Sequence, residues 1–173
     1  LEAFRKFAGS EVMKLAWTDN SNELIGAFKE MAMGAFKEIK VVHDLATQGR
    51  TQSNGRAERL VRRVMDGTKT LLLQAGLPPG FWPYAMRAYC FGQNIDVVAG
   101  DSSWNKRHGR GQFDGRTIPF GCLVDFRPQP DVAKTMPKAS IDTVPGLFFG
   151  YKLKPGGIWE NEYKVADLRV FKD

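Results

Sequence analysis

The spacing of apolar residues alternates between strand and helix patterns along the first part of the chain. An apolar run at 11–18 is typical of a strand, and residues 22–36 repeat apolar side chains at helical spacing. A second short strand is predicted at 39–43, and the tail of a helix at 1–8. The polar stretch 47–55 has no periodicity and predicts a loop. This order of elements predicts an α/β fold.

Two helices are predicted after that loop, at 55–75 and from Pro79 onward. Asn54 is a candidate N-cap for the first helix, and Gly76, followed by two prolines, provides its end. The first helix is expected to bury an apolar stripe made of Leu60, Val61, Val64, Leu71 and Leu72. The second is expected to carry five residues toward the core: Trp82, Ala85, Met86, Tyr89 and Cys90.

The composition changes after about residue 96. Residues 99–117 are rich in Gly, Ser, Arg and Lys and predict a basic linker. Three β-like runs follow, at 118–126, 146–153 and 162–171, separated by turns that contain proline or glycine. The sequence therefore predicts three parts: an α/β core at 1–98, the linker at 99–117, and a small β-rich segment at 118–173. Six aromatic residues are expected in the core: Phe81, Trp82, Phe148, Phe149, Tyr151 and Trp159.

Charge and composition limit the classes of partner. A chain of 173 residues with net charge +6 and pI near 9.4 favours an acidic partner, nucleic acid first. The alternative is a globular protein that happens to be basic. No apolar run is long enough to span a bilayer, no secretory signal opens the chain, and two cysteines make no disulfide framework. We therefore expect that the protein does not associate with a membrane and that it is intracellular, either nuclear or cytoplasmic.

Two acidic residues stand where a metal site is often built. Asp19 ends the predicted strand at 11–18, and Glu58 lies in the first turn of the basic helix. Carboxylates at a strand end and a helix start can converge on one magnesium or manganese ion, which prefers oxygen ligands. This pattern indicates phosphoryl transfer. The alternative is that Glu58 only complements the helix dipole.

Arginines surround the second acid. Arg56, Arg59, Arg62 and Arg63 lie on the helix, and the last three are at helical i, i+3 and i+4 spacing. Guanidinium forks suit phosphate oxygens, so this face is a candidate DNA surface. The alternative is a solvated face opposite the apolar stripe. The segment 104–116 is a second candidate surface or a plain linker.

The remaining polar residues are weaker candidates for a metal or catalytic site. The spacing of His43, His108, Cys90 and Cys122 matches no short zinc-ligand pair. His43 is expected to pack or to hydrogen-bond near the site, and both thiols are expected in the core. Glu23 lies four residues after Asp19 and is expected to start the next helix rather than to bind metal.

Several blocks of sequence together resemble the integrase core of copia-type retrotransposons. They occur in the family's order and cover nearly the whole chain: Thr18-Asp19-Asn20, Val42-His43-Asp44, Gln52-Ser53-Asn54-Gly55-Arg56-Ala57-Glu58-Arg59, Gln74-Ala75-Gly76-Leu77-Pro78-Pro79-Gly80-Phe81-Trp82, Asn94, Pro119-Phe120-Gly121-Cys122 and Pro145-Gly146-Leu147-Phe148-Phe149-Gly150-Tyr151.

The resemblance implies an RNase H-like core with a D, D, E triad, in which Asp19 is the second acid and Glu58 the third. It implies processing of DNA 3′ ends and their transfer into target DNA, with magnesium or manganese as cofactor. The loop formed by Gln52, Ser53, Asn54 and Gly55 would position Glu58 and touch the DNA end. The full protein would act as a homo-oligomer, and the β-rich segment would support multimerisation or DNA contact.

Three departures from the family pattern qualify this expectation. Residues 1–10 contain only Glu2 as an acid, so the first Asp of the triad is absent from the chain. Ser21 replaces a usual glycine, and Thr51 a usual proline. We therefore expect the C-terminal part of an integrase core that is inactive alone. The alternative is an inactive nucleic-acid-binding remnant of a retroelement polyprotein.

Overall fold

The computed structural model describes residues 15–18, 21–33, 42–45, 55–134, 136–137 and 141–171. The chain divides into two compact units. The first comprises Leu1–Arg63 with Leu153–Trp159, and the second Val64–Lys152 with Glu160–Asp173. The elements are mixed α/β, as the sequence predicts, and form small sheets. The predicted RNase H-like topology and the predicted three-part division stay predictions.

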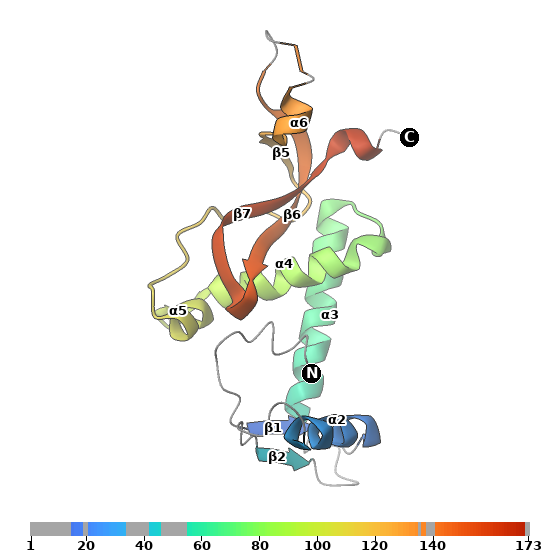
Figure 1. Ribbon diagram of the computed structural model, residues 1–173, viewed down its shortest axis with the longest axis vertical. Helices are drawn as coiled ribbons and strands as arrows, with labels where there is room; N and C mark the ends of the chain where they lie inside the picture. Colours follow the sequence, from blue (N-terminus) through green and yellow to red (C-terminus); the bar gives the residue numbers. More distant parts are fainter. Residues whose placement is uncertain are drawn as a thin grey trace. The chain divides into compact units, whose positions relative to one another are not determined.

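The first unit contains a strand–helix–strand motif. Strands β1 (Leu15–Thr18) and β2 (Val42–Leu45) pair in parallel, with α2 (Asn22–Met33) between them in sequence (Figure 1). The register places Ala16 opposite His43. Parallel strands need such a crossover connection, and α2 provides it. The apolar residues of this segment recur at helical spacing, which is why it forms a helix. Glu23 lies in the first turn of α2, as expected.

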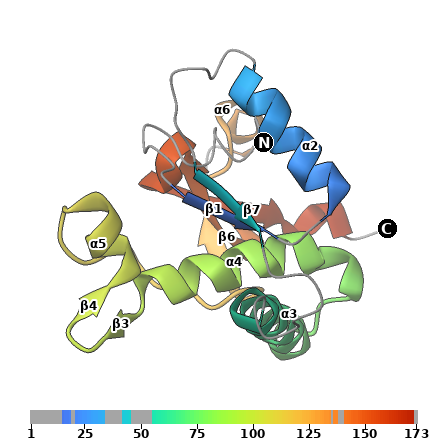
Figure 2. The ribbon, with the colours of Figure 1, turned by 90° about the horizontal axis from the view of Figure 1, so that it is seen from below.

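Two helices form the framework of the second unit, which begins at Val64 within the first of them. Helix α3 (Gly55–Ala75) is followed by the 3-10 turn η2 (Pro79–Phe81) and by α4 (Trp82–Ile95), which crosses α3 (Figure 2). Helix α3 ends as predicted, because Gly76 has a φ of +63° and Leu77 N–H donates to the Leu72 carbonyl at 3.1 Å.

The crossing of α3 and α4 depends on a glycine. A Cβ atom placed on Gly67 of α3 would lie 2.1 Å from Cε2 of Tyr89 on α4. Carbon atoms in contact normally lie roughly 3.5–4.0 Å apart. Only glycine therefore allows the Tyr89 ring to pack directly on the α3 backbone.

A hairpin and a short helix follow α4. Strands β3 (Val97–Val98) and β4 (Asp101–Ser102) pair antiparallel and lead into α5 (Ser103–His108). The Asp101 carboxylate accepts hydrogen bonds from Ser102 N, Asn105 Nδ2 and Gln112 Nε2 at 2.8, 2.9 and 3.1 Å. The bond from Asn105, followed by that from Ser102, lowers the pKa of Asp101. The predicted linker thus contains regular structure, which its Gly- and Ser-rich composition did not suggest.

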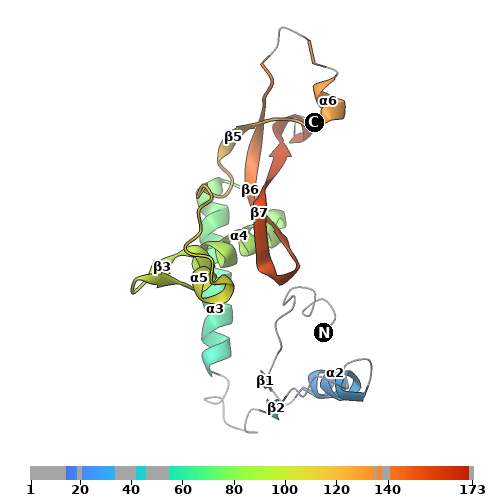
Figure 3. The same cartoon turned by 60° about the vertical axis from the view of Figure 1, so that its left-hand side comes forward.

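The C-terminal part is a three-stranded sheet in the order β5-β6-β7 (Figure 3). It consists of β5 (Leu123–Phe126), β6 (Val144–Lys154) and β7 (Ile158–Asp167). Each strand overlaps one of the three predicted β-like runs, although β7 begins four residues before its run and ends four residues earlier. Short helical turns complete it: α6 (Pro130–Ala133), η3 (Pro155–Gly157) and η4 (Leu168–Phe171).

The core of the second unit lies between the two helices and β6. Leu72, Ala85, Phe120 and Phe149 form its buried centre. The Phe149 ring lies 5.3 Å from the Phe81 ring and 5.7 Å from the Phe120 ring, between centroids. These are contact distances for aromatic pairs. The expectation that Phe81, Phe148 and Phe149 pack inside agrees with this arrangement.

Two expectations about burial are wrong. Leu60 and Val61 are 61% and 62% exposed, whereas Leu72, further along the same helix, is buried in the core of the second unit. Trp82 is 51% exposed. It is the first residue of α4, and helical side chains lean toward the N-terminus, away from the residues that follow in the helix.

Candidate nucleic-acid interface

The N-terminal half of α3 carries an arginine face. Arg56, Arg59, Arg62 and Arg63 are all exposed. With about 100° of rotation per helical residue, these four positions fall within an arc of about 120°. The apolar positions of the helix lie on the other side. The spacing predicted from the sequence therefore produces one continuous basic surface, which we call the arginine face.

The positive charges of the arginine face are not compensated by acidic side chains of the described residues. Among the described residues, none of its four guanidinium groups forms an ion pair or a side-chain hydrogen bond. One turn further on, by contrast, Lys69 lies 3.9 Å from the Asp66 carboxylate. Like charges at i, i+4 spacing destabilise a helix by roughly 0.2–0.5 kcal/mol per pair, and cations near a helix N-terminus oppose its dipole. Folding therefore gains nothing from these charges, and an external anion would stabilise them.

Glu58 lies at the border of the arginine face. It occupies the first turn of α3, is exposed, and precedes Arg62 by four residues. Its carboxylate complements the helix dipole and is accessible to an ion from solvent. Both interpretations from the sequence, a dipole partner and a metal ligand, are compatible with this position.

The other predicted residues of the site adjoin described elements. Asp19 directly follows Thr18, the last residue of β1. Gln52, Ser53 and Asn54 directly precede Gly55, where α3 begins. Asp19, Gln52, Ser53 and Asn54 themselves lie outside the described residues. The convergence of Asp19 and Glu58 therefore stays a prediction.

His43 is fixed beside the end of β1. Its Nε2 lies 2.7 Å from the Thr18 hydroxyl, and its ring stacks on Phe28 at 4.3 Å between centroids. The sequence-based expectation that His43 packs and hydrogen-bonds agrees with both contacts. In parallel sheets, sites form at the carboxyl ends of strands. The Thr18–His43 bond links β2 to the carboxyl end of β1.

A second group of cations lies in the second unit. The pKa of Lys164 on β7 is lowered by burial and by the positive charges of Arg87 on α4 and Lys152 on β6. Lys152 also pairs with the Glu162 carboxylate at 2.5 Å. Sequence analysis missed this cluster because its members are far apart along the chain and share no local pattern.

Three further findings concern classes of site and partner. Within the described residues, no three His, Cys, Asp or Glu side chains are grouped closely enough to hold a metal ion. Nor does any helix of the described segments combine the length and apolar content needed to cross a bilayer. No protein family, curated protein or solved structure that we compared matches the chain.

Proposed function

We propose that this chain is part of a copia-type integrase that binds DNA through the arginine face of α3. The observation that carries the proposal is a row of four exposed arginines that have no acidic partner among the described residues, with an exposed glutamate in the same first turns of the helix. The resemblance of the sequence blocks to this family supplies the expected substrate, DNA ends and target DNA.

The phosphate backbone of DNA fits the arginine face. Guanidinium groups donate paired hydrogen bonds to phosphate oxygens, and neutralising phosphates releases bound counterions. Arg87, Lys152 and Lys164 add positive charge in the second unit, which is partly offset by the Glu162 carboxylate that pairs with Lys152. Phosphate contacts of this kind read no bases, so binding is expected to depend strongly on salt and weakly on duplex sequence.

Asp19 and Glu58 would hold the divalent ion. Glu58 meets the requirement for an accessible oxygen ligand, and Asp19 follows a strand end, where ligands commonly sit. When bound, magnesium or manganese polarises the phosphate and favours deprotonation of the attacking hydroxyl. In the reaction, a water or 3′-hydroxyl oxygen bonds to phosphorus, the bond to the leaving 3′ oxygen breaks, and that oxygen takes a proton from solvent.

A nucleic-acid-binding remnant without chemistry is the second candidate. It is favoured by the fact that the arginine face needs no carboxylate to bind phosphate. Both candidates predict DNA binding, and only the first predicts metal-dependent cleavage by the complete protein.

The binding test compares salt dependence. Fluorescence anisotropy of a labelled duplex is measured over a series of salt concentrations for wild type and for the Arg59→Gln/Arg62→Gln double variant. Because each phosphate contact adds about 0.9 to the slope of log K against log salt, the slope should fall by about 2 in magnitude. Arg127→Gln is the matched control, since Arg127 is exposed and lies 3.7 Å from its partner Asp142.

Equal slopes for the double variant and wild type would refute the DNA-binding role of the arginine face. To separate the two candidates, the complete protein that contains this chain is incubated with the same duplex and manganese. The integrase is favoured if Glu58→Gln abolishes nicking while the control Glu30→Gln does not. Glu30 is exposed and lies on α2. Salt-dependent binding without nicking favours the remnant.

A further inference from the structure

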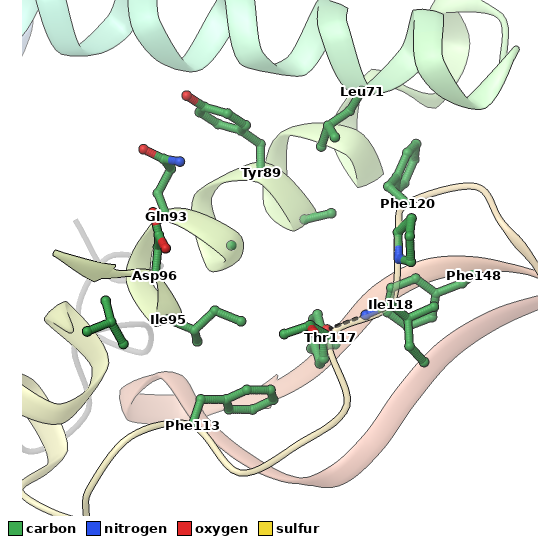
Figure 4. A pocket seen from close by; sticks show the side chains of 15 residues that line it. Leu71, Tyr89, Gln93, Ile95, Asp96, Phe113, Thr117, Ile118, Phe120 and Phe148 are labelled. Carbon is green, nitrogen blue, oxygen red and sulfur yellow. Dashed lines mark hydrogen bonds between the residues drawn. The ribbon is translucent and has the colours of Figure 1, made fainter. Parts of the chain in front are cut away.

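A cleft of about 510 Å³ opens in the second unit between α4 and the segment 113–120 (Figure 4). Pockets for small molecules typically span roughly 300–1,000 Å³. Five aromatic residues line it: Tyr89, Phe113 and Tyr151 are half-buried, whereas Phe120 and Phe148 are almost wholly buried. Flat aromatic walls favour a flat ligand that can stack on them.

Two polar side chains extend at one end of the cleft. Gln93 lies on α4, and Asp96 follows three residues later at the end of that helix. Both are exposed, and neither side chain hydrogen-bonds or pairs with any described residue. A carboxylate only accepts hydrogen bonds, whereas an amide both donates and accepts. This end of the cleft is therefore suited to a ligand edge with N–H donors beside an acceptor.

The wall opposite α4 is held in place by tyrosine hydroxyls. Tyr151 accepts from Ile118 N–H at 3.3 Å and donates to the Arg116 carbonyl at 2.9 Å. Tyr163 accepts from Arg116 N–H at 3.1 Å. The cleft is thus formed before any ligand arrives, which reduces the entropy lost on binding. The exposed side chain of Arg116 adds positive charge next to Thr117 of the wall.

Gly92 keeps the cleft open on the α4 side. It lines the space, and a Cβ atom placed there would meet no atom within 4 Å. Glycine in a helix costs about 0.5–1 kcal/mol relative to alanine. A larger side chain at this position would enter the cleft without disturbing the packing around it.

We propose that this cleft binds an unpaired nucleobase that carries an exocyclic amino group. The base stacks on the half-buried aromatic rings of the cleft, and its amino group donates to Asp96 while Gln93 contacts the neighbouring ring nitrogen. Glutamine pairs with the N6/N7 edge of adenine, and acidic side chains accept from the N4 amino group of cytosine. Arg116 contacts the adjoining phosphate. This function goes beyond the proposed one, because it uses none of the arginine face.

The test uses nucleosides, which carry no phosphate and so do not engage the arginine face. Adenosine and uridine are titrated into the full chain, and amide chemical shifts are followed by NMR. Adenosine should shift the amide signals of Thr117 and Ile118 and bind at least about tenfold more tightly than uridine, which lacks the amino group. Asp96→Asn should remove most of that preference.

Gly92→Leu fills the cleft and should weaken adenosine binding at least about tenfold, while duplex binding through the arginine face is unchanged. Gly26→Leu is the matched control, since Gly26 is also helical with no atom within 4 Å of its Cβ position and does not line the cleft. Gly92→Ala adds a single methyl group to the cleft and replaces Gly92→Leu in this test if the leucine variant does not fold.

Three results would overturn the proposal. They are equal affinity for adenosine and uridine, adenosine binding that survives both Gly92 variants, and binding of N-acetyltryptophanamide where no nucleoside binds. The last result would assign the cleft to an aromatic side chain of a protein partner. Failure of duplex binding alone would count against the proposed function and not against this cleft.

Discussion

Replacing Gly67 with alanine tests how closely α3 and α4 approach. The added Cβ would lie 2.1, 2.2 and 2.6 Å from three ring carbons of Tyr89. These distances are more than 1 Å short of the roughly 3.5–4.0 Å at which carbon atoms pack. The clash involves a ring, which cannot bend away, so either the ring or the helix must shift.

The net effect is a difference between two opposing terms. Overpacking a core contact costs about 1–3 kcal/mol, whereas alanine is favoured over glycine inside a helix by about 0.5–1 kcal/mol. Gly67→Ala should therefore lower the free energy of unfolding by about 1–2 kcal/mol. Gly92→Ala on α4, where no atom lies within 4 Å, should raise it by about 0.5–1 kcal/mol.

A double-mutant cycle separates the clash from other effects. Urea unfolding followed by circular dichroism is measured for Gly67→Ala, Tyr89→Ala and the double variant. Without the Tyr89 ring, Gly67→Ala should become stabilising, so its effect changes sign. Stabilisation by Gly67→Ala in the wild-type background, equal to that of Gly92→Ala, would refute direct packing of the Tyr89 ring on α3.

Three further perturbations test other contacts. Hydrogen bonds from Arg169 lower the pKa of Asp167 to about 2, so its stabilising contribution is complete above its ordinary value of 3.8 and is lost as pH falls through about 2. Asp167→Asn should flatten the acid-unfolding profile in that window; an unchanged profile would contradict the pairing. Tyr151→Phe should cost about 1 kcal/mol and speed amide hydrogen exchange in the cleft wall, and unaltered exchange would argue against its hydroxyl bonds. Gly121→Ala should destabilise by about 2 kcal/mol or more in urea, because φ is +76° and the new Cβ would lie 2.3 Å from that of Ala75; a neutral effect would disprove this contact.

The sequence predicts the elements of this fold better than their burial. The end of α3 can be predicted from local sequence, because Gly76 and the two prolines after it are residues that terminate a helix. Exposure of Leu60 and Val61 cannot be predicted in the same way. Periodicity shows which side chains share a helix face, but not whether another element covers that face.

The candidate sites differ in the same respect. The arginine face follows from i, i+3 and i+4 spacing on one helix, so local sequence is sufficient to predict it. The cleft combines residues from Leu71 on α3 to Tyr151 on β6, which only tertiary packing brings together. The Asp101 carboxylate likewise joins β4 to Gln112, eleven residues further on. The regular structure of this segment therefore cannot be predicted from its Gly- and Ser-rich composition.

The most direct measurement of the proposed function is manganese-induced broadening of backbone amide signals in the full chain. Broadening by a paramagnetic ion reports distance without requiring catalytic turnover. The account predicts that substoichiometric manganese broadens the signals around both Asp19 and Glu58, and that Asp19→Asn or Glu58→Gln removes both effects together. Broadening at only one of the two positions, or its persistence in both variants, would contradict the convergence of the two acids on one metal ion.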